Sequence, residues 1–220
     1  MFIIGITGSF GTGKTTVAKI FKELGAKLID ADKLAHKIIR PKTMAWKKVI
    51  ASFGRNILLP QGIIDRKKLG SIVFKDKPSL DKLCRIIHPI VIEEIEKKVN
   101  QIKIDTPDSL VVIDAPLLIE AGLMDKIDAL IVVKANRETQ IKRSINRTRL
   151  SRDQILQRIR MQMSLKDKEE KADYIIDNNG TLAQTKKEVE RVWVLLQDKW
   201  KRQKNQRGVG KEFSPRFSRM

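Results

Sequence analysis

The sequence predicts an α/β domain built on a five-stranded, doubly wound parallel sheet, and three observations lead to that fold class. Short apolar runs rich in β-branched residues recur along the chain, as strands covered on both faces require. Patterns with helical spacing separate those runs. A glycine-rich loop joins the first run to the first helical pattern, which gives the order strand, loop, helix of an open α/β sheet.

The expected strands are apolar throughout rather than alternating. FIIGI begins at Phe2 and leads through the loop into TTVAKIFKELG, a helical pattern that Gly25 ends. Because helical patterns lie between the strands, we expect the strands to run parallel. The four later strands are AKLID (26–30), SLVVID (109–114), ALIVVKA (129–135) and ADYIID (172–177).

The loop GSFGTGKT, residues 8–15, fits the pattern G-x-x-x-x-G-K-[ST]. Glycines allow a positive φ and a close backbone approach, so the loop N–H groups and the helix N-terminus can converge on an anion. Lys14 would reach the outer phosphates, and the Thr15 hydroxyl would ligate Mg²⁺. The alternative is a glycine turn without a ligand, and the flanking strand and helix speak against it. The candidate ATP-binding residues here are Gly8, Gly11, Thr12, Gly13, Lys14, Thr15 and Thr16.

Residues 33–106 are too many for one crossover, and we expect them to form a mostly helical insertion at the C-terminal edge of the sheet. Ligands of open α/β sheets bind at that edge. The helical pieces are 43–53, 65–74, 79–87 and 89–99. They are separated by the turn signals Pro41, Gly54, Gly62, Pro78 and Pro89.

Basic side chains recur in the segment after the fourth strand. Ser151 and Gln154 fit a capping box, so two helices are expected to meet near Leu150. Arg143 and Arg147 are four residues apart and share one helix face. The segment is either a solvated basic face or a lid that closes arginines onto phosphates, and we favour the lid because a phosphate loop exists for it to cover.

Carboxylates follow two of the expected strands. Asp30 and Asp32 end the second strand, where a carboxylate could orient, or take the proton from, a hydroxyl that attacks a γ-phosphate. The alternative for Asp32 is a helix N-cap, and the two roles can coexist. Asp114 ends the third strand and could hold Mg²⁺ through water, or could belong to a purely structural turn with Pro116. IIDNNG (175–180) ends the fifth strand in a turn where a purine base could be held.

At 220 residues the chain is expected to be one domain, 1–200. Its parts are a core (1–32, 107–140 and 169–200), the insertion 33–106 and the lid 141–168. The single cysteine, Cys84, lies in LDKLCRII and is typical of a helix core. No apolar run approaches bilayer length, and a cleaved signal peptide is not expected, so we expect a cytoplasmic protein without a membrane partner.

The formal net charge of +19 is concentrated in part at the end of the chain. Residues 201–220 contain seven Lys or Arg and one Glu, and they lack helical periodicity. We interpret them as a disordered basic tail. We prefer the interpretation that the tail is solvated and binds nothing. Nucleic-acid binding by the tail is the alternative, and it stays open.

Several strings together resemble the dephospho-coenzyme A kinase family. They are ITGSFGTGKTTVAKIFKELGAKLIDADKLAHKII, LDKLCRIIHPIVIEEIE, DAPLLIEAG and IIDNNG, in order between residue 1 and about 200. The phosphate loop is shared with many unrelated proteins, whereas the combination of D-A-D, H-P, P-L-L-x-E and I-D-N-N-G is far more specific. The resemblance implies a fold akin to nucleoside monophosphate kinases. It also implies Mg²⁺-dependent transfer of phosphate from ATP to the ribose 3′-hydroxyl of dephospho-coenzyme A.

The resemblance also implies roles for individual residues. Asp32 would be the base that faces the acceptor hydroxyl, and Arg147, with Arg143 beside it, would be the lid arginine. The implied catalytic residues are Asp32, Lys14 and Arg147. The implied acceptor side comprises Asp32, Arg66, His88, Pro116, Leu117, Leu118 and Glu120, and the implied purine loop comprises Asn178, Asn179 and Gly180.

The chain departs modestly from the family pattern, and three rival functions remain. Ser9 and Phe10 stand where the family often has Gly and Ile, and Asp114 is variable in the family. A different small-molecule kinase would share the loop and lid and differ within 33–106. A nucleic-acid-dependent NTPase would explain the charge and bind in a strongly salt-dependent way. A non-catalytic nucleotide sensor would need neither Asp32 nor Arg147.

Overall fold

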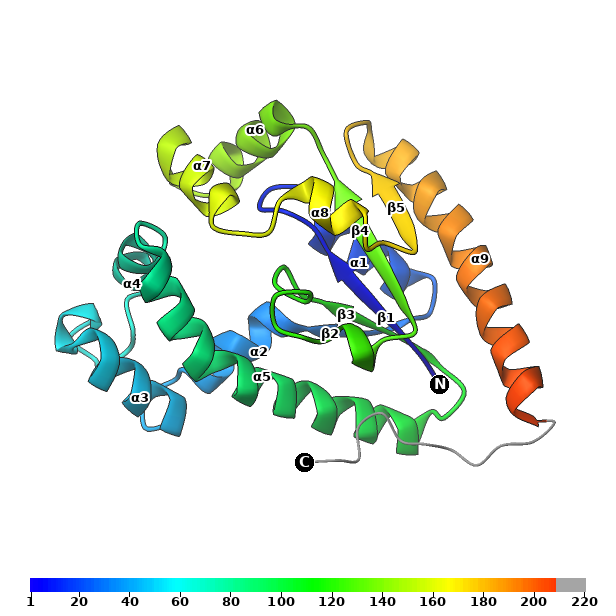
Figure 1. Ribbon diagram of the computed structural model, residues 1–220, viewed down its shortest axis with the longest axis horizontal. Coiled ribbons are helices and arrows are strands. Elements are labelled where there is room, and N and C mark those ends of the chain that lie inside the picture. The colour runs from blue at the N-terminus through cyan, green and yellow to red at the C-terminus, as the bar shows by residue number, and fades with distance from the viewer. Residues whose placement is uncertain (209–220) are drawn as a thin grey trace.

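The computed structural model describes residues 1–208 and shows a single parallel five-stranded sheet in the order β2-β3-β1-β4-β5 (Figure 1). All five strands occur where the sequence predicts them, with ends that differ by one or two residues. The strands are β1 (Phe2–Thr7), β2 (Lys27–Asp30), β3 (Leu110–Asp114), β4 (Ala129–Lys134) and β5 (Tyr174–Asp177).

The register of the strands brings their polar ends to one edge of the sheet. Asp30 at the end of β2 pairs in register with Asp114 of β3, and Asp114 in turn pairs with Ile6 of β1. The glycine-rich loop leaves β1 one residue later, at the same edge. Parallel pairing therefore places the loop and two carboxylates side by side, as the sequence predicts.

Helices cover both faces of the sheet. On one face lie α1 (Lys14–Glu23) and α9 (Leu182–Gly208), which bury Phe21 and Val192 against the strands. The other face is covered by α2 (Ala31–Ile38) and α5 (Lys77–Asp105), which bury Leu34 and Ile95. The layers are therefore those of a doubly wound α/β fold.

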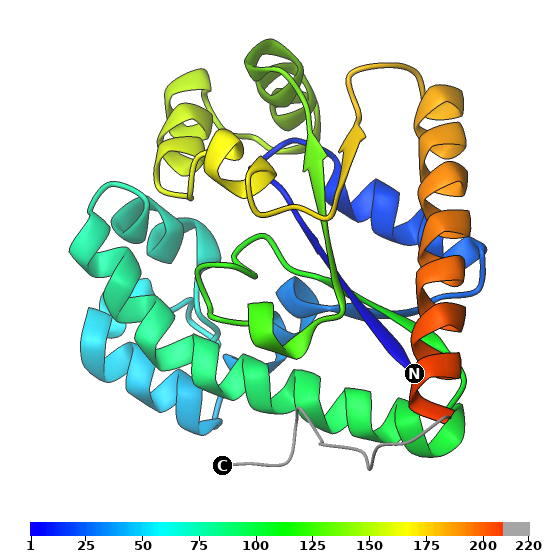
Figure 2. The ribbon, with the colours of Figure 1, turned by 45° about the vertical axis from the view of Figure 1, so that its right-hand side comes forward.

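The predicted insertion is helical and has a hydrophobic core of its own. It contains α3 (Met44–Phe53), a 3₁₀ turn (Arg55–Ile57) and α4 (Arg66–Val73), which pack with α2 against the first half of α5. Figures 1 and 2 show this group standing to one side of the sheet's carboxyl edge. The insertion thus forms a second lobe that faces the glycine-rich loop.

The expected break at Pro89 is wrong, because α5 runs without interruption from Lys77 to Asp105 with Pro89 inside it. Proline removes one helical hydrogen bond and normally kinks or ends a helix. Here the residues on both sides are held by packing: Leu80 lies in the core of the insertion, and Val91 and Ile95 lie in the core under the sheet. Pro78, read as a turn, instead occupies the first turn of this helix, where proline is tolerated.

The segment after β4 contains α6 (Arg137–Arg147), α7 (Arg152–Arg160) and α8 (Leu165–Glu169). The capping box is confirmed, because the Gln154 N–H donates to Ser151 Oγ and the Ser151 N–H donates to Gln154 Oε1. Buried Ile141, Ile155 and Ile159 hold α6 against α7, and Phe10 of the glycine-rich loop packs on them. Figure 2 shows these helices above the loop, across from the insertion.

The basic tail begins later than predicted, since α9 continues to Gly208. Trp200 packs against the core, and Lys204 Nζ lies 2.6 Å from Asp108 Oδ2. The predicted disorder of 209–220 lies outside the described residues.

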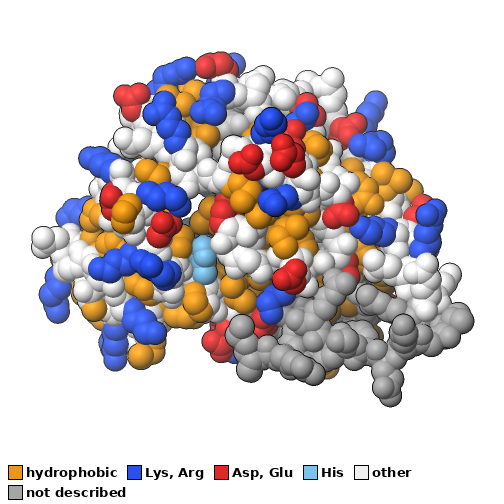
Figure 3. All heavy atoms as spheres, viewed as in Figure 1, with side chains coloured by type: hydrophobic (Ala, Val, Ile, Leu, Met, Phe, Trp, Pro, Cys, Tyr) orange, Lys and Arg blue, Asp and Glu red, His pale blue; other side chains and the backbone are white. Residues whose placement is uncertain are grey.

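On the face in Figure 3, Lys and Arg are scattered among Asp and Glu rather than gathered in one stripe. None of the helices within residues 1–208 is long and apolar enough to cross a membrane.

Candidate functional site

The glycine-rich loop has the backbone geometry that a phosphate-binding loop needs. Gly11 and Gly13 have φ values of 83° and 87°, in the left-handed region that favours glycine. A Cβ atom on Gly11 would lie 2.6 Å from the Gln140 carbonyl oxygen, and one on Gly13 would collide with the Asn178 side chain. The two glycines therefore allow the backbone to turn, and they allow α6 and the β5–α9 loop to pack closely against the glycine-rich loop. Because α1 begins at Lys14, its first N–H groups lie at the loop and can bind an anion.

Thr12 serves the shape of the loop. Its N–H and its hydroxyl both donate to the Ser9 carbonyl, at 3.2 and 2.9 Å, and its own carbonyl accepts from Asn178 Nδ2 at 2.8 Å. The side chain is fully buried. Thr12 thus stabilises the loop through these bonds, whereas Thr15 is only partly buried and lines the pocket.

Lys14 lies between two carboxylates. Its Nζ donates to Asp114 Oδ1 at 2.9 Å and lies 3.6 Å from Asp32 Oδ2. The Asp114 side chain is only 2% exposed, whereas that of Asp32 is 57% exposed. The buried carboxylate therefore orients the lysine, and the exposed one faces the open pocket.

The structure rules out the N-cap alternative for Asp32, and its role toward an acceptor hydroxyl stays a prediction. The N-cap of α2 is Asp30, whose Oδ1 accepts from the Lys33 N–H at 2.9 Å. Asp32 lies in the first helical turn, and its carboxylate is not used as a cap. Asp32 is therefore available to an acceptor hydroxyl, with its contact to Lys14 the longer of the two ion pairs that the lysine makes.

Oxygen atoms suited to Mg²⁺ surround the lysine. The Thr15 hydroxyl follows it in sequence, and Asp114 and Asp32 contribute carboxylate oxygens beside it. Mg²⁺ prefers a few hard oxygen ligands and retains waters and substrate phosphates as the others. The residues present thus fit a magnesium ion held chiefly by a nucleotide.

The predicted purine loop is attached to the phosphate loop through side chains. Asn178 donates to the Thr12 carbonyl, and its Oδ1 accepts from Thr185 Oγ1 at 2.6 Å. Asn179 Oδ1 accepts from the Asn136 N–H at 2.8 Å, at the start of α6. Arg143 Nη1 donates to the Asn178 carbonyl at 2.6 Å. Arg143 thereby supports this loop, and Arg147, one turn later, lines the pocket.

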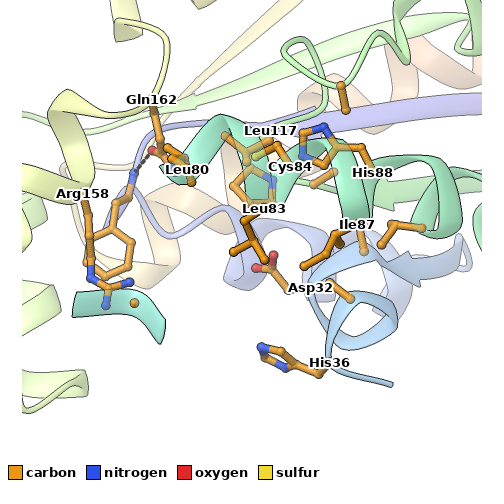
Figure 4. Close-up of a pocket in the computed structure, with 18 of the residues that line it drawn as sticks. Asp32, His36, Leu80, Leu83, Cys84, Ile87, His88, Leu117, Arg158 and Gln162 are labelled. Atoms are coloured by element: carbon orange, nitrogen blue, oxygen red, sulfur yellow. Dashed lines mark hydrogen bonds between the residues drawn. The ribbon is translucent and has the colours of Figure 1, made fainter. Parts of the chain in front are cut away.

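A pocket of about 530 Å³ lies between the glycine-rich loop, the insertion and α7 (Figure 4). Its polar wall carries Lys14 and Thr15 from the loop and Asp32 from α2. Its apolar wall comes mainly from α5, including Leu83 and Ile87. Five of the seven predicted acceptor-side residues line it: Asp32, Arg66, His88, Pro116 and Leu117.

The other two residues predicted on the acceptor side do not line this pocket: burial speaks against a ligand contact for Leu118, and the role of Glu120 stays a prediction. Leu118 is fully buried in the core beneath Gly5, so its role is packing. Glu120 lines a neighbouring hollow rather than the main pocket. Its Oε1 lies 3.0 Å from Lys168 Nζ and accepts from the Met163 N–H at 3.1 Å. Glu120 thus connects the loop after β3 to α8.

Lys168 is fully buried and ties three segments together. Its Nζ donates to the Pro116 carbonyl at 2.7 Å, contacts Glu120, and lies 3.5 Å from Thr7 Oγ1. Burial lowers the pKa of Lys168, and the nearby Glu120 carboxylate opposes that shift. The lysine thereby fixes the 115–121 loop against the end of β1.

His36 is a pocket residue that sequence reasoning missed. It lies four residues after Asp32 on α2, so the two share a helix face, and this spacing was a usable signal. Burial and the neighbouring Arg66 lower the pKa of His36, while Asp32 and Asp30 act in the opposite direction. Burial likewise lowers the pKa of His88, against a smaller effect of Glu120. Both imidazoles are therefore favoured in the neutral form.

Cys84 lies on α5, as predicted, and lines the pocket. Burial raises the pKa of its thiol, so the protonated form is favoured. This matches the interpretation of Cys84 as a packing residue rather than a nucleophile.

Comparison with known proteins supports one family over most of the chain. The sequence model of dephospho-CoA kinases matches residues 2–184. A dephospho-CoA kinase of Carboxydothermus hydrogenoformans is 44% identical over 199 residues, which cover 90% of this chain and 95% of that protein. A dephospho-CoA kinase of Geobacter sulfurreducens is 42% identical over 193 residues, covering 88% and 98%.

Solved structures agree with the sequence matches. The dephospho-CoA kinase from Campylobacter jejuni has a TM-score of 0.61 at 31% identity, covering 86% of this chain and 94% of its own. The Thermus thermophilus protein TT1252 has a TM-score of 0.73 at 29% identity, covering 88% and 96%. A shikimate kinase from Acinetobacter baumannii, at 18% identity and a TM-score of 0.52, covers 90% and 94% and shares the fold.

Proposed function

The chain belongs to the dephospho-CoA kinase family, and we propose that its two lobes bring ATP and dephospho-coenzyme A together at Asp32 and Lys14. It is a transferase that catalyses the last step of coenzyme A synthesis. The γ-phosphoryl group of ATP passes to the ribose 3′-hydroxyl of the acceptor. The observation that carries this assignment is the 3.6 Å contact between an exposed carboxylate and the phosphate-loop lysine, at the mouth of the acceptor pocket.

ATP would bind along the glycine-rich loop. The loop N–H groups and the start of α1 receive the phosphates, and Lys14 reaches the outer ones. Arg147 approaches from α6 and would stabilise the charge that develops on the transferred group. The 178–180 loop, held by Thr12 and Thr185, would receive the purine base.

The acceptor would enter the pocket between the insertion and the 115–121 loop, with its 3′-hydroxyl at Asp32. The hydroxyl proton passes to the Asp32 carboxylate while the ribose oxygen forms a bond to the γ-phosphorus. The bond from that phosphorus to the β–γ bridging oxygen breaks, and ADP leaves. Positioning and charge stabilisation are sufficient for such a transfer, and no covalent enzyme intermediate is required.

Mg²⁺ is expected with the nucleotide. The Thr15 hydroxyl and, through water, Asp114 would hold it. When bound, the ion neutralises charge on the β- and γ-phosphate oxygens. Asp114 serves Lys14 directly, whether or not the ion also uses it.

The assay that tests this function measures ADP release with Mg-ATP and each of four additions: dephospho-coenzyme A, AMP, shikimate and DNA. We expect turnover with dephospho-coenzyme A, and ³¹P NMR should show a new phosphomonoester at the 3′ position. Turnover with AMP or shikimate but not with dephospho-coenzyme A would refute the proposed substrate. The proposed role of the phosphate loop would still hold in that case. Stimulation of ATP hydrolysis by DNA would favour the nucleic-acid-dependent alternative.

We also propose a cytoplasmic location. A membrane partner is not expected, and a nucleic-acid partner is not needed to explain the site. The basic tail remains the segment in which such a role could be sought.

A further inference from the structure

Arg158 lines the pocket but has no role in the proposed phosphoryl transfer. It lies on α7, and its guanidinium carbon is 4.0 Å from the centre of the Phe74 ring and 5.7 Å from that of Phe10. Phe74 ends α4 in the insertion, whereas Phe10 belongs to the phosphate loop. Figure 4 shows Arg158 at one end of the pocket, next to Gln162 and away from His88. The guanidinium therefore stands between the lobes, closer to the insertion.

Arg158 carries a positive charge without an acidic neighbour. In residues 1–208 no salt bridge to it is found, whereas Arg152 on the same helix pairs with Glu138 at 2.8 Å. Burial lowers the pKa of Arg158, and no neighbouring carboxylate counters that effect. The contact with the Phe74 ring face stabilises the guanidinium in part, but no carboxylate neutralises its charge, so an anionic ligand would stabilise it further.

A second arginine lines the same wall. Arg66 lies at the start of α4, one helical turn before Gly70. A Cβ on Gly70 would lie 3.0 Å from Arg158 Nη2, so the tip of Arg158 rests on the helix turn next to Arg66. In the part of the chain described by the structure, Arg66 also has no salt bridge, and its charge reaches His36. Two guanidinium groups from different lobes thus converge on the acceptor side.

The other basic residues of the pocket are Lys14 and Arg147, which the proposed function gives to the nucleotide, and His36 and His88, which favour the neutral form. Toward α5 the pocket is lined by Leu80, Leu83 and Ile87. Lys14 is paired with Asp114 and belongs to the phosphate loop. An anionic part of the acceptor would therefore be drawn to the two arginines.

We propose that Arg158, together with Arg66, binds the 5′-diphosphate of the acceptor. The inference rests on the proposed function, because it takes the acceptor to be a nucleoside whose 3′-hydroxyl lies at Asp32. The diphosphate is then a few bonds away across the same ribose, toward α4. Guanidinium groups bind phosphate oxygens with paired, charge-assisted hydrogen bonds, which suits a diphosphate better than an apolar wall would. Arg158 reaches that site only when α7 lies against α4, so the acceptor helps to hold the lobes together.

The test compares Arg158→Gln and Arg66→Gln with Arg160→Gln. Arg160 is on the same helix as Arg158 but is exposed, which makes it a matched control. Isothermal titration calorimetry measures the binding of dephospho-coenzyme A, and separately of ATP, to each full-length variant. We expect each pocket variant to bind dephospho-coenzyme A about tenfold to a hundredfold more weakly, with ATP affinity unchanged. The control should bind both as the wild type does.

A kinetic comparison with adenosine adds a second readout, because adenosine keeps the ribose and lacks the diphosphate. The advantage of dephospho-coenzyme A over adenosine in kcat/KM should shrink in Arg158→Gln, and Arg158→Lys should restore part of it. A loss confined to ATP binding would instead assign Arg158 to the donor phosphates and refute the proposal. Unchanged binding of dephospho-coenzyme A would refute it as well. If wild-type protein fails to phosphorylate dephospho-coenzyme A, the proposed function itself is wrong.

Discussion

Two aspartates that are two residues apart do different work at the start of α2. Asp30 is at the N-cap and accepts from the Lys33 N–H, while Asp32 points its carboxylate toward Lys14. Aspartate favours both the N-cap and the first turn of a helix, so residue type alone does not separate the two positions. The difference arises because the strand ends at Asp30, and Asp32 is then carried round to the pocket by the first turn of the helix.

Asp32→Asn should lower kcat by about a hundredfold to ten-thousandfold, the range typical of a lost general base, with ATP affinity retained. Steady-state kinetics and nucleotide titration measure the two quantities. Asp30→Asn is the matched control, because asparagine caps a helix as well as aspartate does, and its kcat should stay near the wild-type value. A change in ATP affinity alone in Asp32→Asn would assign this carboxylate to the metal.

Lys14→Ala should abolish turnover and should also destabilise the fold. Asp114 is buried and would lose its cation, which can cost up to about 3–5 kcal/mol. The double variant Lys14→Ala with Asp114→Asn should recover much of the melting temperature without recovering activity. If that double variant turns over normally, the phosphate-loop lysine has no catalytic role.

At the scale of elements, α8 and the 115–121 loop are joined by an ion pair whose lysine is buried and whose glutamate is partly exposed. Lys168 holds the Pro116 carbonyl and the Glu120 carboxylate, and the loop in turn supplies Pro116 and Leu117 to the pocket wall. Glu120 also accepts from the Met163 N–H, at the end of the candidate lid. A substitution that disturbs this contact should therefore weaken acceptor binding.

Lys168→Met should lower the melting temperature and raise the KM for dephospho-coenzyme A more than the KM for ATP. The reason is that Glu120 would be left without its cation and the acceptor loop would loosen. Lys199→Met removes a more exposed pair, Lys199–Asp173 at 2.9 Å, and should change stability by less than about 1 kcal/mol. Equal effects of the two substitutions, in calorimetry and kinetics, would contradict a positioning role for Lys168.

Long-range packing also explains the elements that sequence patterns placed wrongly. The pattern on either side of Pro89 is helical, and the proline suggested a boundary. Two hydrophobic cores, one in each lobe, hold the two halves of α5 in one line. In the same way, Trp200 and Lys204 extend α9 into the basic segment that was predicted to be a tail.

For the whole molecule, acidification should reduce stability through the histidines. The pKa of His88 is lowered from its ordinary value of 6.5 by burial, and that of His36 is lowered as well. Below pH 6.5 the unfolded chain takes up protons that the folded chain does not yet bind, so the folded state loses stability. As the pH falls, this loss of stability grows until the pH has passed the lowered pKa, and it then levels off. Above pH 6.5 the loss is absent.

Melting temperatures at about pH 7.5 and about pH 5.5 should therefore differ less for His88→Asn than for the wild type. In a chain of this size, each kcal/mol corresponds to about 2–4 °C. The rising net positive charge acts in the same direction in both proteins, so the comparison isolates the histidine. An identical pH dependence in the two proteins would show that His88 does not contribute.

The sequence by itself determined the sheet, the phosphate loop and the carboxylates at the ends of β2 and β3, because periodicity and turn chemistry are local properties. It also indicated Lys14, Asp32 and Arg147, through a motif and a resemblance that tie residue types to fixed spacings. Arg158 and Lys168 carried no such signal: Arg158 resembles its exposed neighbour Arg160 in sequence, and Lys168 stands in a run of charged residues. Only the tertiary structure decided which of these cations is buried and what it faces, because burial and partners depend on segments far apart in the chain.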